Sequence, residues 1–198
     1  MSEYNYIYLK KVLGFFISCV SLIFLAIPLL LLSLFLLIYY RGNPFYIGKR
    51  AGIDGQVFNQ YKFRSMYDCD SESGEIQRVS FVGSFLRKWS IDELPQLLNV
   101  VKGDMSLIGP RPLTAEYIKY YTDFEKRRLE VKPGLTGYAQ VNGRNNLTWE
   151  EKFRLDVHYV DNLSWKLDLK ILFATFKVVL TKEGINQTSE VTSTRFIR

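Results

Sequence analysis

The stretch RKWSIDELPQLLNVVKGDMSLIGPRP (Arg87–Pro112) places two adjacent carboxylates, Asp92 and Glu93, at the expected start of a helix. Ser90 is a favourable N-cap, and Glu93 stands three residues later, where a capping box has its second member. Apolar residues recur at helical spacing after the two carboxylates, and Gly103 supplies a stop. The pattern therefore predicts a capped helix whose first turn carries Asp92.

Two interpretations of the carboxylate pair are open. Acidic residues in a first helical turn are ordinary capping chemistry. A negative charge at this position is also favoured by the helix dipole and by free N–H groups, so an ionised Asp92 suits a nucleophile or a metal ligand. Because the apolar stripe faces a core, we expect Asp92, Gln96 and Asn99 to face away from it.

The turn that follows this helix favours the functional interpretation. In Gly109-Pro110-Arg111-Pro112 each proline fixes its own φ angle and restricts the residue before it. A structural turn needs the prolines but not the arginine between them. A rigidly presented guanidinium suits bidentate recognition of a phosphate, so Arg111 is a candidate phosphate ligand.

Composition narrows the chemistry. The 198 residues include 26 Lys and Arg against 20 Asp and Glu, and the net charge of +6 favours anionic partners. Cys19 and Cys69 show no metal-binding spacing and predict no disulfide, which fits a reducing cytoplasm. His158 is the single histidine, so acid–base work falls to other side chains, and we expect it to be a packed or surface residue. The basic residues form no cluster, which argues against nucleic-acid binding.

An apolar run near the N-terminus predicts a membrane element. No residue from Val12 to Tyr40 is charged, and this run is long enough to cross a bilayer as a helix. However, Pro28 lies in the middle of the run, where it should kink a helix. Lysines precede the run and basic residues follow it, so the positive-inside rule places both ends on one side. A re-entrant helix and a spanning helix are both consistent with these residues.

The chain after the apolar run predicts short strands and helices. Pro44–Gly48 and Gln56–Met66 are expected to form a hairpin in which Lys62 and Arg64 share one face, either as a phosphate site or as a solvated surface. A short helix or a turn is expected over 78–89. Helices are expected over 114–131, with a new start at a capping box of Thr122 and Glu125, and over 148–162, starting at a capping box of Thr148 and Glu151. Ser164–Thr181 is amphipathic and suits a core helix or a membrane-surface helix equally. The tail after Gly184 is polar, and we expect it to be mobile.

Several motifs in fixed order resemble a known family. The chain carries KFRSM (Lys62–Met66), SIDELPQLLNVVKGDMSLIGPRP (Ser90–Pro112), KPGLTGYAQVNGRN (Lys132–Asn145) and LDVHYVDN (Leu155–Asn162) behind an apolar N-terminal run. This arrangement is similar to the bacterial sugar transferases, and more narrowly to the small monotopic polyprenyl-phosphate phosphoglycosyl transferases. The resemblance covers nearly the whole chain apart from the tail.

The resemblance implies an activity. Such enzymes move a phosphosugar from a UDP-sugar to undecaprenyl phosphate with Mg2+, release UMP, and form a covalent phosphosugar on the first carboxylate of an Asp-Glu pair. Asp92 would then be the nucleophile, and Glu93 would help hold Mg2+ or handle a proton. A re-entrant helix that breaks at its proline is also implied. Candidate phosphate-binding cations are Lys62, Arg64, Arg87, Arg111 and Arg144. Candidate supporting residues are Pro28, Ser90, Pro110, Pro112, Gln140 and Asp156.

These expectations define an α+β fold, mostly helical, with one small hairpin and amphipathic interfacial helices. We expect a membrane-associated element over residues 1–41, a catalytic domain over 42–183 and a polar tail over 184–198. The expected location is the bacterial inner membrane, with membrane lipids as partners and the catalytic domain on the cytoplasmic face. The rival hypothesis is a non-catalytic membrane-anchored module that binds anionic lipid or a partner enzyme.

Overall fold

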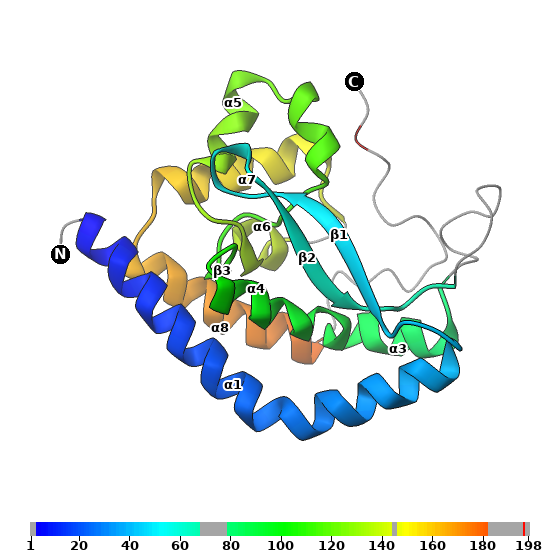
Figure 1. Ribbon diagram of the computed structural model, residues 1–198. Coiled ribbons are helices and arrows are strands. Elements are labelled where there is room, and N and C mark those ends of the chain that lie inside the picture. The colour runs from blue at the N-terminus through cyan, green and yellow to red at the C-terminus, as the bar shows by residue number, and fades with distance from the viewer. Residues whose placement is uncertain (1–2, 68–78, 144–145, 182–195, 197–198) are drawn as a thin grey trace.

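The computed structural model describes residues 3–67, 79–143, 146–181 and 196, and it is mostly helical as predicted (Figure 1). The helices are α1 (Glu3–Tyr39), α3 (Phe81–Lys88), α4 (Leu97–Lys102), α5 (Asp123–Lys126), α6 (Tyr138–Val141), α7 (Trp149–Asp161) and α8 (Trp165–Thr181). Short 3-10 helices are η1 (Ile53–Gly55), η2 (Ile91–Gln96), η3 (Ala115–Tyr120) and η4 (Arg127–Leu129). The strands are β1 (Phe45–Ala51), β2 (Val57–Phe63), β3 (Ser106–Ile108) and β4 (Gly134–Thr136).

The predicted hairpin is confirmed. Strands β1 and β2 pair antiparallel, with Phe45 opposite Phe63 and Ala51 opposite Val57. The turn between them contains Asp54 at φ 52°, a left-handed conformation that Asp tolerates better than most side chains. The second strand lies against η2, so the hairpin covers the stretch that carries the two carboxylates.

The prediction of one capped helix from Ser90 is wrong. The chain instead forms the 3-10 helix η2 and then α4, because Pro95 lacks an N–H and cannot continue an α-helical ladder from the preceding turn. Ser90 adopts φ 55° and its side chain caps nothing, so the expected capping box with Glu93 does not form. The predicted stop is confirmed, since Gly103 ends α4 at φ 85°.

The polar side of this stretch is buried rather than turned away from the core. Asp92, Gln96 and Asn99 expose only 7%, 2% and 0% of their surface, because β2 covers them. The strand supplies partners for the amide of Asn99: Tyr61 N–H donates to its Oδ1 at 3.0 Å, and its Nδ2 donates to the Asn59 carbonyl at 2.7 Å. A polar helix face is thus satisfied by a strand edge, which the amphipathic pattern alone did not indicate.

Helix α1 is a single 37-residue element that includes Pro28. Figure 1 shows that its axis changes direction partway along, so that its two arms form an open V beneath the rest of the fold. Most apolar side chains of α1 are exposed, and it is the one described helix that is long and apolar enough to cross a membrane. Buried residues along α1 include Tyr6, Ser18 and Leu36, and Tyr40, directly after the helix, is also buried.

Both ends of α1 are attached to the folded domain. At the N-terminal end, Lys10 Nζ lies 2.8 Å from Asp168 Oδ2 in α8, and the Tyr6 hydroxyl donates to the same carboxylate. At the C-terminal end a hydrophobic cluster joins α1 to β2 and α3 through Leu36, Tyr40, Phe63 and Leu86. The two ends are therefore held on the same body of the protein.

Helix α8 has one packed face and one exposed apolar face. Asp168, Ile171 and Val178 are buried against the domain. The opposite side exposes large apolar side chains: Trp165, Leu169, Phe173, Phe176 and Leu180. The sequence suited either a core helix or a surface helix, and the structure shows that α8 has the properties of both. It lies near α1 on the same side of the molecule (Figure 1).

Two predicted capping boxes are confirmed at α5 and α7. The side chains of Thr122 and Thr148 accept from backbone N–H groups, while Glu125 and Glu151 return the second bond. Residues 182–195 lie outside the described part of the chain, so most of the predicted tail is not described. Phe196 is buried among aromatic side chains of η3 and α7, a contact that the polar composition of the tail did not predict.

Candidate active site

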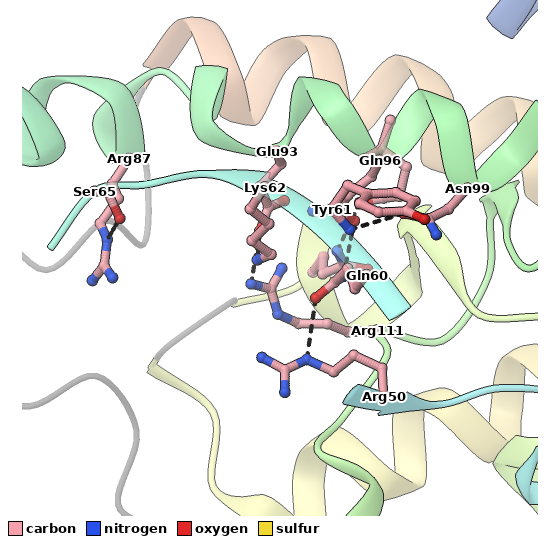
Figure 2. Close-up of polar contacts among 12 residues, drawn as sticks. Arg50, Gln60, Tyr61, Lys62, Ser65, Arg87, Glu93, Gln96, Asn99 and Arg111 are labelled. Atoms are coloured by element: carbon pink, nitrogen blue, oxygen red, sulfur yellow. Dashed lines mark hydrogen bonds and ion pairs between the residues drawn. The ribbon is translucent and has the colours of Figure 1, made fainter. Parts of the chain in front are cut away.

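Glu93 is the centre of a charged cluster built from three parts of the chain. Lys62 Nζ of β2 donates to Glu93 Oε1 at 2.8 Å, and Arg111 Nη2 donates to the same oxygen at 2.9 Å. Figure 2 shows Lys62 and Arg111 approaching Glu93, with Arg111 coming from the turn after β3. Two cations from distant segments thus share one carboxylate oxygen, which places all three groups in one site.

The charges of this cluster stabilise one another. Burial alone would raise the pKa of Glu93, but Arg111 and Lys62 outweigh it and hold that pKa well below its usual range. Burial lowers the pKa of Lys62, with Glu93 opposing the shift. The pKa of Arg111 is raised mainly by Glu93. Glu93 is therefore an ionised anchor for two cations, and its side chain is not used as a helix cap.

Asp92 has a contrasting environment. It is 7% exposed, and it forms no hydrogen bond or ion pair with any residue that the structure describes. Burial, followed by the charge of Glu93, raises the pKa of Asp92 to about 6. The sequence predicted that a helix dipole would favour the ionised form of Asp92. The first turn of the short helix η2 does not outweigh the effect of burial on its pKa. At neutral pH Asp92 is still largely ionised, but it is poorly solvated and receives no direct contact from a described cation.

The other predicted cations are divided between this cluster and its surroundings. Arg87 Nε donates to Ser65 Oγ at 2.9 Å, and the positive charge of Arg87 lowers the pKa of Asp92. Arg64 follows the end of β2, where its Nε donates to the Met66 carbonyl and its guanidinium lies 5.0 Å from the ring centre of Tyr40. The described contacts therefore bring Lys62 to Glu93, whereas those described for Arg64 are to Met66 and Tyr40. Arg144 lies outside the described residues.

The turn that carries Arg111 is held by a tight crossing of two backbones. Gly109 N–H donates to the Thr136 carbonyl at 2.9 Å, and Gly134 N–H donates to the Pro110 carbonyl at 2.9 Å. A Cβ atom on Gly134 would lie 2.1 Å from the Gly109 nitrogen, so this approach requires glycine. Two restraints therefore hold the predicted Pro-Arg-Pro turn: the parallel pairing of β3 with β4, and the fixed φ angle of Pro112.

The predicted supporting residues lie on the elements that surround the turn. Gln140 of α6 donates to the Leu135 carbonyl at 3.0 Å. Asp156 of α7 accepts two hydrogen bonds from Arg128 of η4. His158 stacks on Tyr138 and is a packed surface residue, as predicted. Gln140 and Asp156 thus contribute to the structure around the carboxylates rather than to the charged cluster itself.

Sequence reasoning missed a polar chain behind the site. Arg50 Nε donates to Gln60 Oε1 at 3.1 Å, and Gln60 Nε2 donates to Gln96 Oε1 at 3.0 Å (Figure 2). Arg50 also donates to Thr114 Oγ1 at 3.1 Å. Gln96 lies one turn after the carboxylates, so the chain ties the hairpin to the site. Neutral amides give no signal in a sequence until their partners across the fold are known.

The two carboxylates also offer a donor set for Mg2+. Asp92 has no partner among the described residues, and only one oxygen of Glu93 receives the two cations. Magnesium needs only one or two carboxylates when substrate phosphates and water complete its shell. Among the residues described, no three acidic, histidine or cysteine side chains form a metal cluster. The residues present therefore fit a Mg2+ shared with a phosphorylated substrate, and not one enclosed by protein alone.

The chain belongs to the bacterial sugar transferase family, whose model matches residues 5–182. It is 54% identical over 160 residues to the "uncharacterized sugar transferase EpsL" of Bacillus subtilis, covering 78% of this chain and 79% of that protein. It is 37% identical over 198 residues to the "undecaprenyl-phosphate galactose phosphotransferase" of Salmonella typhimurium, covering 89% of this chain and 41% of that protein.

A third relative is the "UDP-glucose:undecaprenyl-phosphate glucose-1-phosphate transferase" of Xanthomonas campestris, which is 38% identical over 154 residues. That match covers 70% of this chain and 32% of the relative. Several of the relatives are thus much longer than the chain, which spans about two fifths of the Salmonella protein. The shared region is the one that contains the charged cluster and the Pro-Arg-Pro turn.

Proposed function

We propose that this protein transfers a phosphosugar from a UDP-sugar to undecaprenyl phosphate, giving undecaprenyl-diphosphate-sugar and UMP. The observation that carries this proposal is the contrast within the carboxylate pair: Glu93 is neutralised by two cations, whereas Asp92 is buried and has no hydrogen-bond or ion-pair partner in the described part of the chain. The names of the Salmonella and Xanthomonas relatives support the acceptor and the donor class. This reaction would be the first membrane step in the synthesis of a glycoconjugate.

Asp92 is proposed as the nucleophile of a two-step transfer. One of its oxygens attacks the β-phosphorus of the UDP-sugar, the bond from that phosphorus to the bridging oxygen breaks, and UMP leaves. An oxygen of undecaprenyl phosphate then attacks the phosphorus, and the bond to the Asp92 oxygen breaks. Because Asp92 is weakly solvated and receives no hydrogen bond from the residues that the structure describes, its lone pairs are available to the incoming phosphorus.

The cations are proposed to neutralise the phosphate charge during both steps. Arg111 exposes 47% of its side chain and already meets Glu93, so its remaining donors can face a bound diphosphate. Lys62 and Arg87 add positive charge around Asp92. Mg2+ held by Asp92, Glu93 and the diphosphate would supply further charge neutralisation when bound. Since its pKa is depressed, Glu93 is proposed to act as an anionic anchor and metal ligand rather than as a proton donor.

A re-entrant membrane helix is proposed to place this site at the lipid surface. The attachment of both ends of α1 to one domain supports it, because a straight spanning helix would separate those ends by the bilayer. The exposed apolar face of α8 would rest on the same leaflet, with the catalytic domain on the cytoplasmic face of the inner membrane. Single cysteines placed at Tyr4 and at Asn59 should label from the same side of sealed vesicles, and opposite labelling would establish a spanning helix.

The transfer is tested by measuring UMP release from a panel of UDP-sugars, with undecaprenyl phosphate and Mg2+ in detergent or nanodiscs. We expect release with at least one sugar, and we expect a lipid-linked product that depends on the acceptor. Asp92→Asn should abolish both release and any protein-bound phosphosugar detected by intact mass. Asp54→Asn, on the exposed hairpin turn, is the matched control and should retain activity. Full activity in Asp92→Asn would remove the nucleophile role.

A non-catalytic membrane module is the alternative function. Helix α8 exposes Lys166, Lys170 and Lys177 beside its apolar face, which favours attraction to anionic lipid whether or not the protein is an enzyme. This alternative predicts binding to vesicles without UMP release from any UDP-sugar. The same panel therefore separates the two hypotheses.

A further inference from the structure

Arg128 of η4 is a buried cation that connects α7 to the turn carrying Arg111. Its side chain is 2% exposed, and Nη2 lies 2.8 Å from Asp156 Oδ2 of α7, while Nε donates to the same oxygen at 3.0 Å. Nη2 also donates to the backbone carbonyl of Arg111 at 2.6 Å. Tyr121 lies beside the guanidinium, with its hydroxyl 3.4 Å from Nη1. One guanidinium thus contacts both a countercharge and the backbone of the candidate active-site turn.

The Arg111 carbonyl lies in a turn with few internal hydrogen bonds. Pro110 and Pro112 have no N–H, so the turn has fewer donors for its own carbonyls. The Pro110 carbonyl is satisfied by Gly134 of β4, and the Arg111 carbonyl is satisfied by Arg128. The two acceptors on either side of the Arg111 residue are therefore held from two separate elements.

Only an arginine can make this set of contacts from one position. The guanidinium presents five N–H donors in a fixed plane, so it can bind a carboxylate and a carbonyl at the same time. A lysine would keep the charge opposite Asp156, but its compact ammonium lacks the planar fork that reaches both acceptors. The charge of Arg128 and its geometry can thus be separated by one conservative substitution.

We propose that Arg128 is a positioning residue for Arg111, held in place by Asp156. The Arg111 side chain is long and half exposed, so fixing its backbone carbonyl limits the positions from which its guanidinium can meet Glu93 and a substrate phosphate. The catalytic part of this proposal rests on the proposed transferase function. The structural part, the restraint of the turn by Arg128, stands independently of that function.

The restraint is tested by hydrogen–deuterium exchange on the full-length protein in nanodiscs. Arg128→Lys should speed exchange in peptides that span 108–114, because the turn loses its external donor. Arg127→Lys is the matched control, since the neighbouring Arg127 forms exposed ion pairs with Asp161 and Glu130. Unchanged protection of 108–114 in Arg128→Lys would overturn the proposal whatever the activity.

The catalytic consequence is tested by steady-state kinetics. A misplaced Arg111 should lower kcat by roughly 10- to 100-fold, because small displacements of catalytic groups have effects of this size. We expect the KM for the UDP-sugar to change little, and we expect kcat per folded molecule to fall even where the loss of the Arg111 carbonyl's donor also lowers the unfolding midpoint. A purely structural role would lower the midpoint and leave kcat per folded molecule intact. A wild-type protein without turnover would refute the proposed function, while the exchange experiment would still decide the restraint.

A second variant addresses the stability of the buried pair. Arg128→Met combined with Asp156→Leu removes both charges together, so no uncompensated charge remains inside the protein. This double variant should fold and should show the same faster exchange over 108–114 as Arg128→Lys. A folded double variant with native protection in the turn would contradict the proposal.

Discussion

Replacing Asp92 by asparagine should make the protein more stable at neutral pH while it removes the proposed nucleophile. Burial and the charge of Glu93 raise the pKa of Asp92 from 3.8 to about 6 in the folded state. The folded protein therefore resists ionisation of Asp92, whereas the unfolded chain does not. Stability falls as pH rises from the unfolded value towards the folded value, and the loss is complete above about pH 6.

The size of this effect follows from the shift. A pKa difference of about 2 units corresponds to roughly 3 kcal/mol at pH 7.5, and to about half of that at pH 5. Asparagine carries no charge at either pH, so Asp92→Asn should gain this free energy of unfolding. For a protein of this size the gain corresponds to roughly 6–12 °C in the unfolding midpoint.

The assay is thermal unfolding of wild-type and Asp92→Asn proteins in the same nanodiscs, without substrate or Mg2+, at pH 5 and at pH 7.5. The difference between the two proteins should grow with pH. Asp54→Asn is the control, because Asp54 is exposed and asparagine tolerates its left-handed backbone conformation. An Asp92→Asn protein that is no more stable than wild type at pH 7.5, or whose advantage does not change with pH, would refute this reasoning.

Three further substitutions test how the site is supported, each by chemical or thermal unfolding. Asn99→Ala should lower the free energy of unfolding by about 1–3 kcal/mol because the Tyr61 N–H and the Asn59 carbonyl of β2 lose their partner, whereas Asn162→Ala, at an exposed position, should change it little. Asp168→Asn should lower the free energy of unfolding by about 3 kcal/mol and expose the N-terminal end of α1 to protease, because a lysine and two tyrosines lose their shared carboxylate. Asp161→Asn, which changes an exposed ion pair, should lower it by less than about 1 kcal/mol. Gly83→Ala should lower the free energy of unfolding by about 3 kcal/mol, because the added Cβ would lie 1.9 Å from the backbone oxygen of Ser65. Wild-type stability in any of the three main variants would contradict the corresponding packing.

Local signals in the sequence predicted many elements correctly. Two extended segments predicted the hairpin, the spacing of threonine and glutamate predicted the starts of α5 and α7, and Gly103 predicted the end of α4. These features depend on neighbouring residues, which a sequence displays directly. The start of η2 was predicted wrongly because Ser90 and Glu93 match a capping box, whereas Pro95 and the cations of other segments decide what those side chains do.

The candidate site was predicted in part. Its carboxylates and the rigid Arg111 turn follow from the residues between Arg87 and Pro112, and the structure places Lys62 with them. The sequence did not indicate that Arg64 contacts Tyr40 instead, because strand alternation does not specify what lies opposite each side chain. The role of Arg128 also went unnoticed, since its two acceptors lie 17 and 28 residues away along the chain.

By itself, the sequence determined the apolar helix, the acidic pair, the proline-flanked arginine and the motifs shared with the bacterial sugar transferases. Tertiary structure alone decided which carboxylate is neutralised and which is buried without a hydrogen bond or ion pair from the described residues. Asp92 and Glu93 are adjacent and chemically similar, so nothing local separates them. The hairpin and the Pro-Arg-Pro turn bring two cations to Glu93 and bury Asp92 beside it, and that difference in environment sets their opposite pKa shifts.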